Sequence, residues 1–311
     1  MRFSNEFIPT SKANQPQIVD LPLAYREGDK LPCRDPYILP YDGKYYLYCS
    51  LGQQGIGCYV SDDLKNWYGP KTVFETPEDF HGVKDFFWAP ECHYYKGNFY
   101  IFTSVYSFKY NHRTISVYQS NNPLGPFEDI ADGCISPSDW DAIDGTLYLD
   151  KEGQPWMVFV HEWTSMPDGN GGMVAAKLSE DFTHLISEPI TLFYAKDPSW
   201  SLAGITDGPF LYRTKEGKLL MIWSNFGKED YFISLAVSDN GELTGKWSHE
   251  KLVYQRGARP DFKFDGGHGM IFQGFDGKTY LSMHAPNDKR VETEHLTLFE
   301  IEEKGGSIQI K

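Results

Sequence analysis

Four ionisable residues recur at similar points along the chain, and together they could perform acid–base chemistry. Each stands directly before a proline or glycine that precedes a short apolar run: Asp35, Asp144, Asp207 and His268. Carboxyl groups that share one site push their pKa values apart. One protonated and one ionised carboxyl are what general acid and general base catalysis needs. Taken singly, each residue would more often be an ordinary turn residue, so the prediction depends on the fold bringing them together.

A fifth residue, Ala89, completes a repeat, because these five openers recur every 54, 55, 63 and 61 residues. Each opener lies 8 to 10 residues before a glycine in a hairpin-like turn: Gly43, Gly97, Gly153, Gly217 and Gly277. Four-stranded units of about 40–50 residues are typical of β-propeller blades. The sequence therefore predicts an all-β, five-bladed β-propeller, and the alternative is a sandwich of unrelated hairpins. We expect residues 1–34 to be an N-terminal lead-in packed on the propeller, and residues 35–311 to form a single catalytic propeller domain.

The innermost strands of a propeller line its central channel, so the five openers should face one central pit. Several aromatic residues fall near this pit in the sequence: Phe86, Phe87, Trp88, Trp140, Trp163 and Trp200. Of these, the four tryptophans lie in loops or beside openers, where flat rings could hold the C–H face of a sugar. The alternative is that these rings belong to the core, as most aromatic residues do.

The formal net charge of −14 disfavours nucleic acid or an anionic membrane as a partner, because both are polyanions. Neutral or cationic substrates remain open, and no apolar run approaches the length of a membrane span. The first residues lack the apolar core of a signal peptide. We expect a cytoplasmic protein, or a secreted or periplasmic one if a leader is removed. The five cysteines have no C-x-x-C spacing, which favours free thiols over zinc or a disulfide framework.

The ordered set of motifs resembles glycoside hydrolase family 43 from Asp35 to the C-terminus. The matching stretches are Arg34-Asp35-Pro36, Trp88-Ala89-Pro90-Glu91, Ile143-Asp144-Gly145, Asp207-Gly208-Pro209 and Gly267-His268-Gly269. The resemblance implies an inverting glycoside hydrolase that acts on oligo- or polysaccharides containing arabinose or xylose. It also implies that Asp35 is the general base, that Asp144 orients the acid and modulates its pKa, and that the fourth unit supplies the acid. Residues expected to contact the substrate are Arg34, Trp88, Glu91, Trp163 and His268.

The sequence departs from the family pattern in the fourth unit, where Asp207 replaces the expected glutamate. Its side chain is one methylene shorter, and an acid must come within hydrogen-bond reach of the leaving oxygen. Either the pit is narrower here or another residue is the acid. Glu162, which follows a strand of the third unit, is the main alternative, and Glu91 ranks third.

A pit lined from five sides suits the end of a glycan chain, so we expect exo action. By the resemblance, the released sugar is a terminal α-L-arabinofuranosyl residue first and a β-D-xylosyl residue second. The alternatives are a β-xylosidase or β-galactosidase-type exo-hydrolase of the same fold and a non-catalytic sugar-binding propeller. A retaining fructan-cleaving enzyme is disfavoured, because Arg34 precedes Asp35 where that chemistry needs asparagine.

No cofactor is expected to be required, although the family often binds calcium or water in the central channel. Histidine is a poor ligand for this hard cation, so His268 would contact calcium through water. The alternative is a His268 side chain that is simply hydrogen-bonded in the channel.

Overall fold

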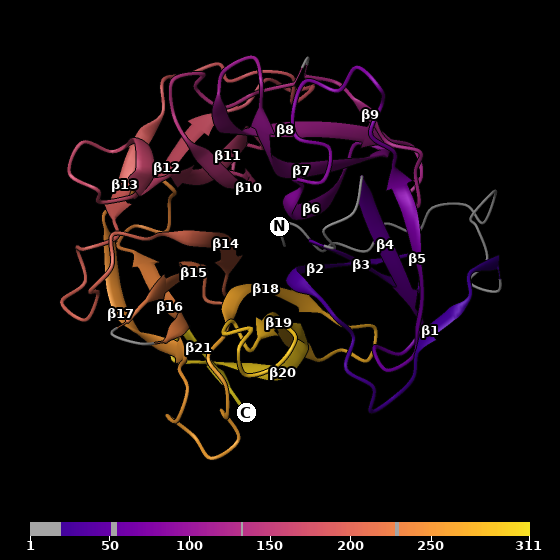
Figure 1. The fold of residues 1–311 in the computed structure, drawn as a ribbon. Helices are drawn as coiled ribbons and strands as arrows, with labels where there is room; N and C mark the ends of the chain where they lie inside the picture. The colour runs from indigo at the N-terminus through magenta and orange to yellow at the C-terminus, as the bar shows by residue number, and fades with distance from the viewer. Residues whose placement is uncertain (1–19, 51–54, 132, 228–229) are drawn as a thin grey trace.

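Five innermost strands surround one central axis, and every strand of the fold is connected outward from them (Figure 1). This computed structural model describes residues 20–50, 55–131, 133–227 and 230–311. Its strands form five antiparallel sheets arranged as blades, and a short 3-10 turn lies at Trp163–Ser165. The predicted all-β, five-bladed propeller is confirmed. Within the described residues, no helix is long and apolar enough to cross a membrane.

Each blade is a meander whose strands follow chain order from the axis outward, except that the first strand of the chain lies outermost in the first blade. The first blade contains β2 (Arg34–Tyr41), β3 (Lys44–Ser50), β4 (Ile56–Ser61) and β5 (Trp67–Phe74), with β1 (Leu23–Tyr25) beyond β5. The second contains β6 (Trp88–Tyr95), β7 (Asn98–Ser107), β8 (His112–Ser120) and β9 (Glu128–Asp129). The third contains β10 (Ala142–Leu149), β11 (Pro155–His161), β12 (Gly172–Lys177) and β13 (Ile190–Tyr194). The fourth contains β14 (Asp207–Arg213), β15 (Leu219–Phe226), β16 (Tyr231–Ser238) and β17 (Trp247–Tyr254). The fifth contains β18 (Gly267–Gln273), β19 (Thr279–Ala285), β20 (His295–Lys304) and β21 (Ser307–Ile310).

The hairpin between the two innermost strands explains why the repeat is visible in the sequence. In the first blade Asp42 and Gly43 both have positive φ, 45° and 78°, between β2 and β3. Two such residues make the tight two-residue turn that matches the twist of paired strands, and Asp-Gly suits it. Lys96 and Gly97 make the same turn in the second blade, with φ of 47° and 91°. The predicted hairpin glycines therefore set the register of the strands that frame the axis.

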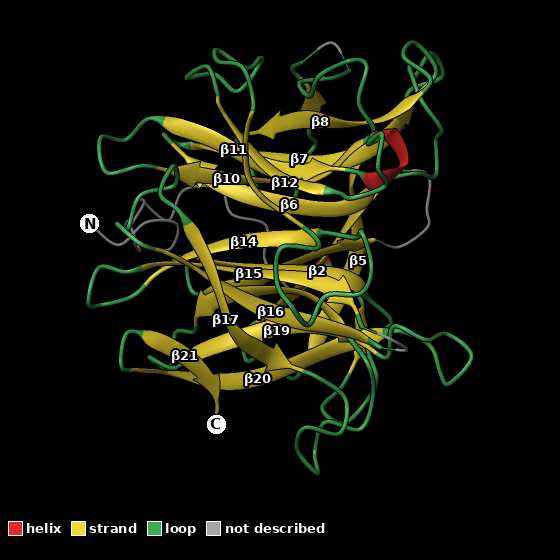
Figure 2. Cartoon of the chain, turned by 90° about the vertical axis from the view of Figure 1, so that its left-hand side faces the viewer, coloured by secondary structure: helices red, strands yellow, loops and turns green. Residues whose placement is uncertain are grey.

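Faces of neighbouring blades pack through large apolar side chains, and Figure 2 shows the strands of the blades from the side. Among the largest side chains with almost no exposure are Trp223, Tyr46, Tyr48 and Phe102. Such burial of ring surface is the main stabilising contribution in a fold with little helix. The five cysteines are free thiols, as expected, and all but Cys134 are buried.

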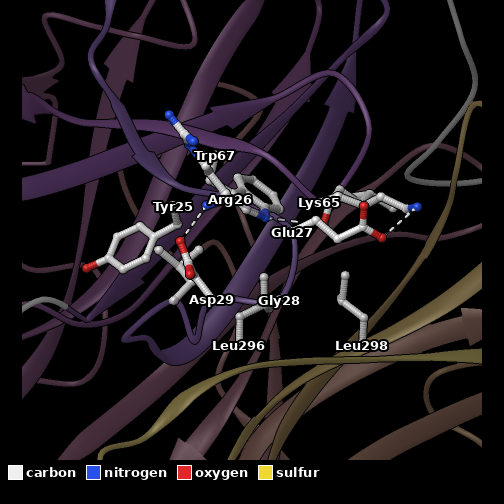
Figure 3. Close-up of a pocket in the computed structure, with 11 residues that line it drawn as sticks. Tyr25, Arg26, Glu27, Gly28, Asp29, Lys65, Trp67, Leu296 and Leu298 are labelled. Atoms are coloured by element: carbon white, nitrogen blue, oxygen red, sulfur yellow. Dashed lines mark hydrogen bonds and ion pairs between the residues drawn. The ribbon is translucent and has the colours of Figure 1, made fainter.

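The segment before β2 joins the first and fifth blades. The Leu31 carbonyl accepts a hydrogen bond from the Leu296 N–H at 3.0 Å, and the Cys33 N–H donates to the Glu294 carbonyl at 3.1 Å. A pocket at this edge lies between the turn Arg26–Asp29, Trp67 and two leucines of β20 (Figure 3). None of the ionisable openers lines it. Residues 1–19 of the predicted lead-in lie outside the described residues.

Candidate active site

One residue near the start of each innermost strand adopts a left-handed backbone conformation. These residues are Asp35 (φ 52°), Ala89 (45°), Asp144 (55°), Gly208 (51°) and His268 (50°). The strand register shifts at the same point in all five blades, so each site is a β-bulge. Positive φ is uncommon for residues other than glycine, and bulges re-aim side chains next to active sites. The fold therefore repeats one strained position five times around the axis.

The predicted equivalence of Asp207 with the other openers is wrong by one residue. The position equivalent to Asp35 is Gly208, which carries the positive φ. Asp207 pairs with Ser224, as Arg34 pairs with Ser50 in the first blade. Asp207 thus enters the site from the preceding position of its strand.

Despite this offset, the structure brings the predicted residues together. His268 Nδ1 lies 3.3 Å from Asp35 Oδ1 and 3.7 Å from Asp144 Oδ2. Asp144 Oδ2 also accepts the N–H of Gly208 at 2.9 Å. This bond ties Asp144 to the residue that follows Asp207, so the carboxyl groups of three blades meet around one imidazole.

Two residues that the sequence reasoning missed complete the ring. The Tyr231 hydroxyl donates to Asp207 Oδ2 at 3.0 Å, and its ring stacks on His284 with centroids 5.8 Å apart. His284 Nδ1 in turn accepts the N–H of Asp35 at 3.2 Å. Both residues belong to apolar strand runs, β16 and β19, and only the polar end of the β19 run could have signalled His284.

Asp35 is held in its ionised form. Its side chain is buried, with 7% exposure, and burial alone would raise its pKa. The charges of His268 and Arg34 outweigh that effect and hold the pKa of Asp35 well below its usual range. Arg34 is itself fixed, since it pairs with Glu294 and donates to Asn287 Oδ1 at 3.2 Å. Asp35 therefore carries a negative charge at any pH near neutrality.

Asp207, in contrast to Asp35, has a raised pKa and favours its protonated form. Burial and then the charge of Asp144 raise the pKa of Asp207 to about 8, against the opposing effects of His268 and the Tyr231 hydroxyl. Burial and the charge of Asp35 also raise the pKa of Asp144. Two such carboxyl groups cannot both ionise near neutrality. The Gly208 N–H opposes the rise in the pKa of Asp144, and Asp207, with its pKa of about 8, keeps its proton near neutral pH.

Glu162, the alternative acid, is buried with 3% exposure and forms an ion pair with Arg113 Nε. Arg113 Nη2 donates further to Thr164 Oγ1 at 3.1 Å, which fixes the guanidinium. Burial raises the pKa of Glu162 and the ion pair opposes that rise. A carboxylate held by arginine is a poor proton donor, so the geometry favours Asp207 as the acid. Glu162 instead adds negative charge that raises the pKa values of Asp144 and Asp207.

Glu91, the third option, is buried on β6 and lies 3.1 Å from His93 Nε2. The other ring nitrogen of His93 lies 3.1 Å from the Tyr37 hydroxyl. These contacts tie Glu91 into the interface of the first two blades. This position favours an electrostatic effect on Asp144 over direct contact with a sugar.

The aromatic candidates divide into two groups. Trp88 is 40% exposed and stacks on Phe86 with centroids 4.1 Å apart, which leaves a rigid ring beside the Asp35 blade. Trp163 is half-buried in the 3-10 turn that follows Glu162. Phe87 instead packs in the hydrophobic core against Phe74, and the partly buried Trp200 packs on the core against Trp223, so the core alternative holds for these two rings. Trp140 stacks on His161 at 3.8 Å.

Direct metal coordination finds no support in the donor set. Among the described residues, no group of three or more His, Cys, Asp or Glu side chains is placed to hold a metal ion. The Nδ1 atom of His268 faces two carboxylates. Calcium held through water at His268 stays a prediction.

Comparison with known proteins identifies the family and the fold of the chain. The model of the family described as Glycosyl hydrolases family 43 matches residues 31–305. The chain is 28% identical to the extracellular exo-α-(1→5)-L-arabinofuranosidase ArbA of Cellvibrio japonicus, over 81% of this chain and 78% of that protein. An endo-arabinase structure from Bacteroides thetaiotaomicron is 35% identical, with a TM-score of 0.79, covering 91% of this chain and 99% of that one. An endo-1,4-β-xylanase structure from the same species is 26% identical, with a TM-score of 0.74 and coverages of 91% and 95%.

Proposed function

Because this chain belongs to glycosyl hydrolase family 43, we propose that it is an inverting exo-hydrolase that releases terminal α-L-arabinofuranosyl residues from arabinan-type glycans. The observation that carries the proposal is the opposite protonation of two carboxyl groups around His268, with Asp35 ionised and Asp207 protonated near neutral pH. The choice of arabinose is supported by relatives that carry arabinofuranosidase and arabinase names. Exo action is supported by the burial of Asp35, Asp144 and His268, which suits a chain end better than a chain interior.

In the proposed reaction, Asp35 accepts a proton from a water molecule that attacks the anomeric carbon. Asp207 donates its proton to the glycosidic oxygen as the bond to the leaving group breaks. Asp207 Oδ2 accepts the Tyr231 hydroxyl, which leaves Oδ1 to carry that proton. Attack from the face opposite the leaving group turns an α-linkage into a β-product. Solvent then returns Asp35 and Asp207 to their starting protonation states.

The test uses α-1,5-linked arabino-oligosaccharides, with nitrophenyl xylosides as the comparison because of the xylanase-like structure. We expect arabinose to be the first product and NMR to detect its β-anomer before mutarotation. Early release of internal fragments would establish endo action, and an initial α-product would exclude inversion. Faster cleavage of the xyloside would reassign the sugar.

The role of Asp207 as general acid is tested by comparing substrates whose leaving groups differ in their need for a proton. Asp207→Asn should lose activity on arabino-oligosaccharides but keep it on a dinitrophenyl arabinofuranoside, whose leaving group needs no proton. Glu162→Gln is the matched carboxyl-to-amide control, and it should change both activities by the same factor. Selective rescue of Glu162→Gln instead of Asp207→Asn would transfer the acid role to Glu162.

A further inference from the structure

Ser50, the last residue of β3, connects the first blade, the second blade and the carboxylate of Asp35. Its hydroxyl oxygen accepts the N–H of Ala89 in the second blade at 3.0 Å. Its hydroxyl proton goes to Asp35 Oδ2 at 3.1 Å. No motif in the sequence singles out this serine.

The directions of these two hydrogen bonds follow from the chemistry of the groups. A backbone N–H can only donate, so the Ser50 oxygen must accept at Ala89. An ionised carboxylate can only accept, so the single Ser50 proton must point to Asp35. The two contacts fill complementary roles of one hydroxyl group, and each fixes the geometry of the other.

In three of the other blades, the residue equivalent to Ser50 joins neighbouring blades, so the contact of Ser50 with the Asp35 carboxylate is an additional role. In three blades the residue at the same register accepts the corresponding backbone N–H: Ser104 from Asp144, Ser224 from His268 and His284 from Asp35. In the third blade this position is Val160, and Gly208 donates to Asp144 Oδ2 instead. The shared task of the position is therefore to join neighbouring blades. Ser50 performs that task at Ala89, which bears no catalytic group, and also binds the base.

Resting on the proposed function, we propose that Ser50 is a positioning residue that fixes the rotation of the Asp35 carboxylate. The terminal torsion of an aspartate side chain is broad, so a carboxylate without a fixed donor samples many rotations. A general base must be aligned with the water it activates, and small misplacements reduce the rate strongly. The ring nitrogens of His268 and His284 contact the other carboxylate oxygen, Oδ1, each at 3.3 Å. At Oδ2, Arg34 Nε is 3.7 Å away and too distant for a hydrogen bond, so Ser50 is the donor that fixes this oxygen.

The experiment compares Ser50→Ala with Ser282→Ala. Ser282, like Ser50, lies on the second strand of its blade, and its buried hydroxyl donates across the blade interface to the Pro36 carbonyl at 3.2 Å. Ser282→Ala removes one bond between blades beside Asp35 without touching its carboxylate. Ser50→Thr keeps the hydroxyl, and Ser50→Cys keeps the size with a weak donor.

We expect Ser50→Ala to lower kcat by roughly ten- to hundredfold, the factor for losing one hydrogen bond to an ionised group. The KM should stay within about twofold, because the base acts in the transition state. The loss should be equal for arabino-oligosaccharides and a dinitrophenyl arabinofuranoside, since a defect in the base does not depend on the leaving group. Ser50→Thr should retain most of the activity, and Ser50→Cys should lose it while remaining folded.

Equal kcat values for Ser50→Ala and Ser282→Ala would overturn the inference and leave the proposed function intact. The same holds for equal activity of Ser50→Cys and Ser50→Thr, which decides the matter if the alanine variant does not fold. A wild-type protein that cleaves neither arabinofuranosides nor xylosides would overturn the proposed function, and this inference with it.

Discussion

The proton on Asp207 should control both the stability and the activity of the protein over the same pH range. Asp207 has a pKa of about 8 in the folded protein, against an ordinary value of 3.8. Because the folded pKa is the higher one, its contribution to stability is fully present below about pH 4 and is lost as the pH rises toward 8. Asparagine at this position keeps an oxygen to accept the Tyr231 hydroxyl but has no proton to lose.

The magnitude follows from linkage. Each pH unit between the two pKa values changes the free energy of unfolding by about 1.4 kcal/mol. From pH 5 to pH 7.5 that amounts to about 3 kcal/mol, and coupling to Asp144 reduces it to about 2–3 kcal/mol. Asp207→Asn should therefore gain about 2–3 kcal/mol of stability relative to the wild type across this range.

Urea unfolding of both proteins at several pH values measures this gain directly. Asp181→Asn is the control, because hydrogen bonds from Ser179 and Thr183 lower the pKa of Asp181 to about 2. Its effect on stability should be constant above about pH 5. In the wild type, kcat/KM should fall above about pH 8 as Asp207 loses its proton. A difference between Asp207→Asn and wild type that does not change with pH would refute the protonated acid.

Three further changes test other parts of the site. Tyr231→Phe removes a hydrogen bond that lowers the pKa of Asp207. The upper limb of the kcat/KM profile should move to higher pH by about one unit, and an unmoved limb would contradict the assignment. Arg113→Met leaves the Glu162 carboxylate buried without its partner. The free energy of unfolding near neutral pH should fall by about 3–5 kcal/mol in urea titrations, and a loss below about 1 kcal/mol would contradict a buried ion pair. Trp88→Ala removes an exposed ring. The KM for arabino-oligosaccharides should rise about fivefold, and an unchanged KM would exclude sugar stacking at this ring.

The propeller was predictable because each repeat contains a hairpin turn whose residues can be recognised in the sequence. The two-residue turns at Asp42-Gly43 and Lys96-Gly97 join the innermost strands of the first two blades, and a positive-φ glycine lies in the corresponding turn of each other blade. The offset of Asp207 was not predictable in the same way. Asp-Pro and Asp-Gly look equivalent along the chain, yet the left-handed position falls on Asp35 in one case and on Gly208 in the other. Only the strand register distinguishes them, and register is a property of the paired strands.

The residues that contact the site carboxylates were harder to predict from the sequence, because they belong to other blades. Arg113 precedes Glu162 by 49 residues and belongs to β8, so no local pattern indicates their ion pair. Tyr231 lies in an apolar strand run and resembles a core residue in the sequence. Its hydroxyl has a role only because His284 of the next blade provides the surface on which its ring stacks.

The difference between base and acid arises from how charge is distributed around a ring that is otherwise repeated. Asp35 has cationic and imidazole neighbours on its side, Arg34 and His268, and they stabilise its negative charge. Asp207 faces Asp144, with Glu162 nearby, and these carboxylates favour its neutral form. The backbone supplies nearly equivalent positions in every blade, so it cannot by itself decide which carboxyl keeps a proton. The side chains between Asp35 and Asp207 determine which carboxyl keeps the proton. The proposed chemistry requires this difference in pKa more than it requires a glutamate at position 207.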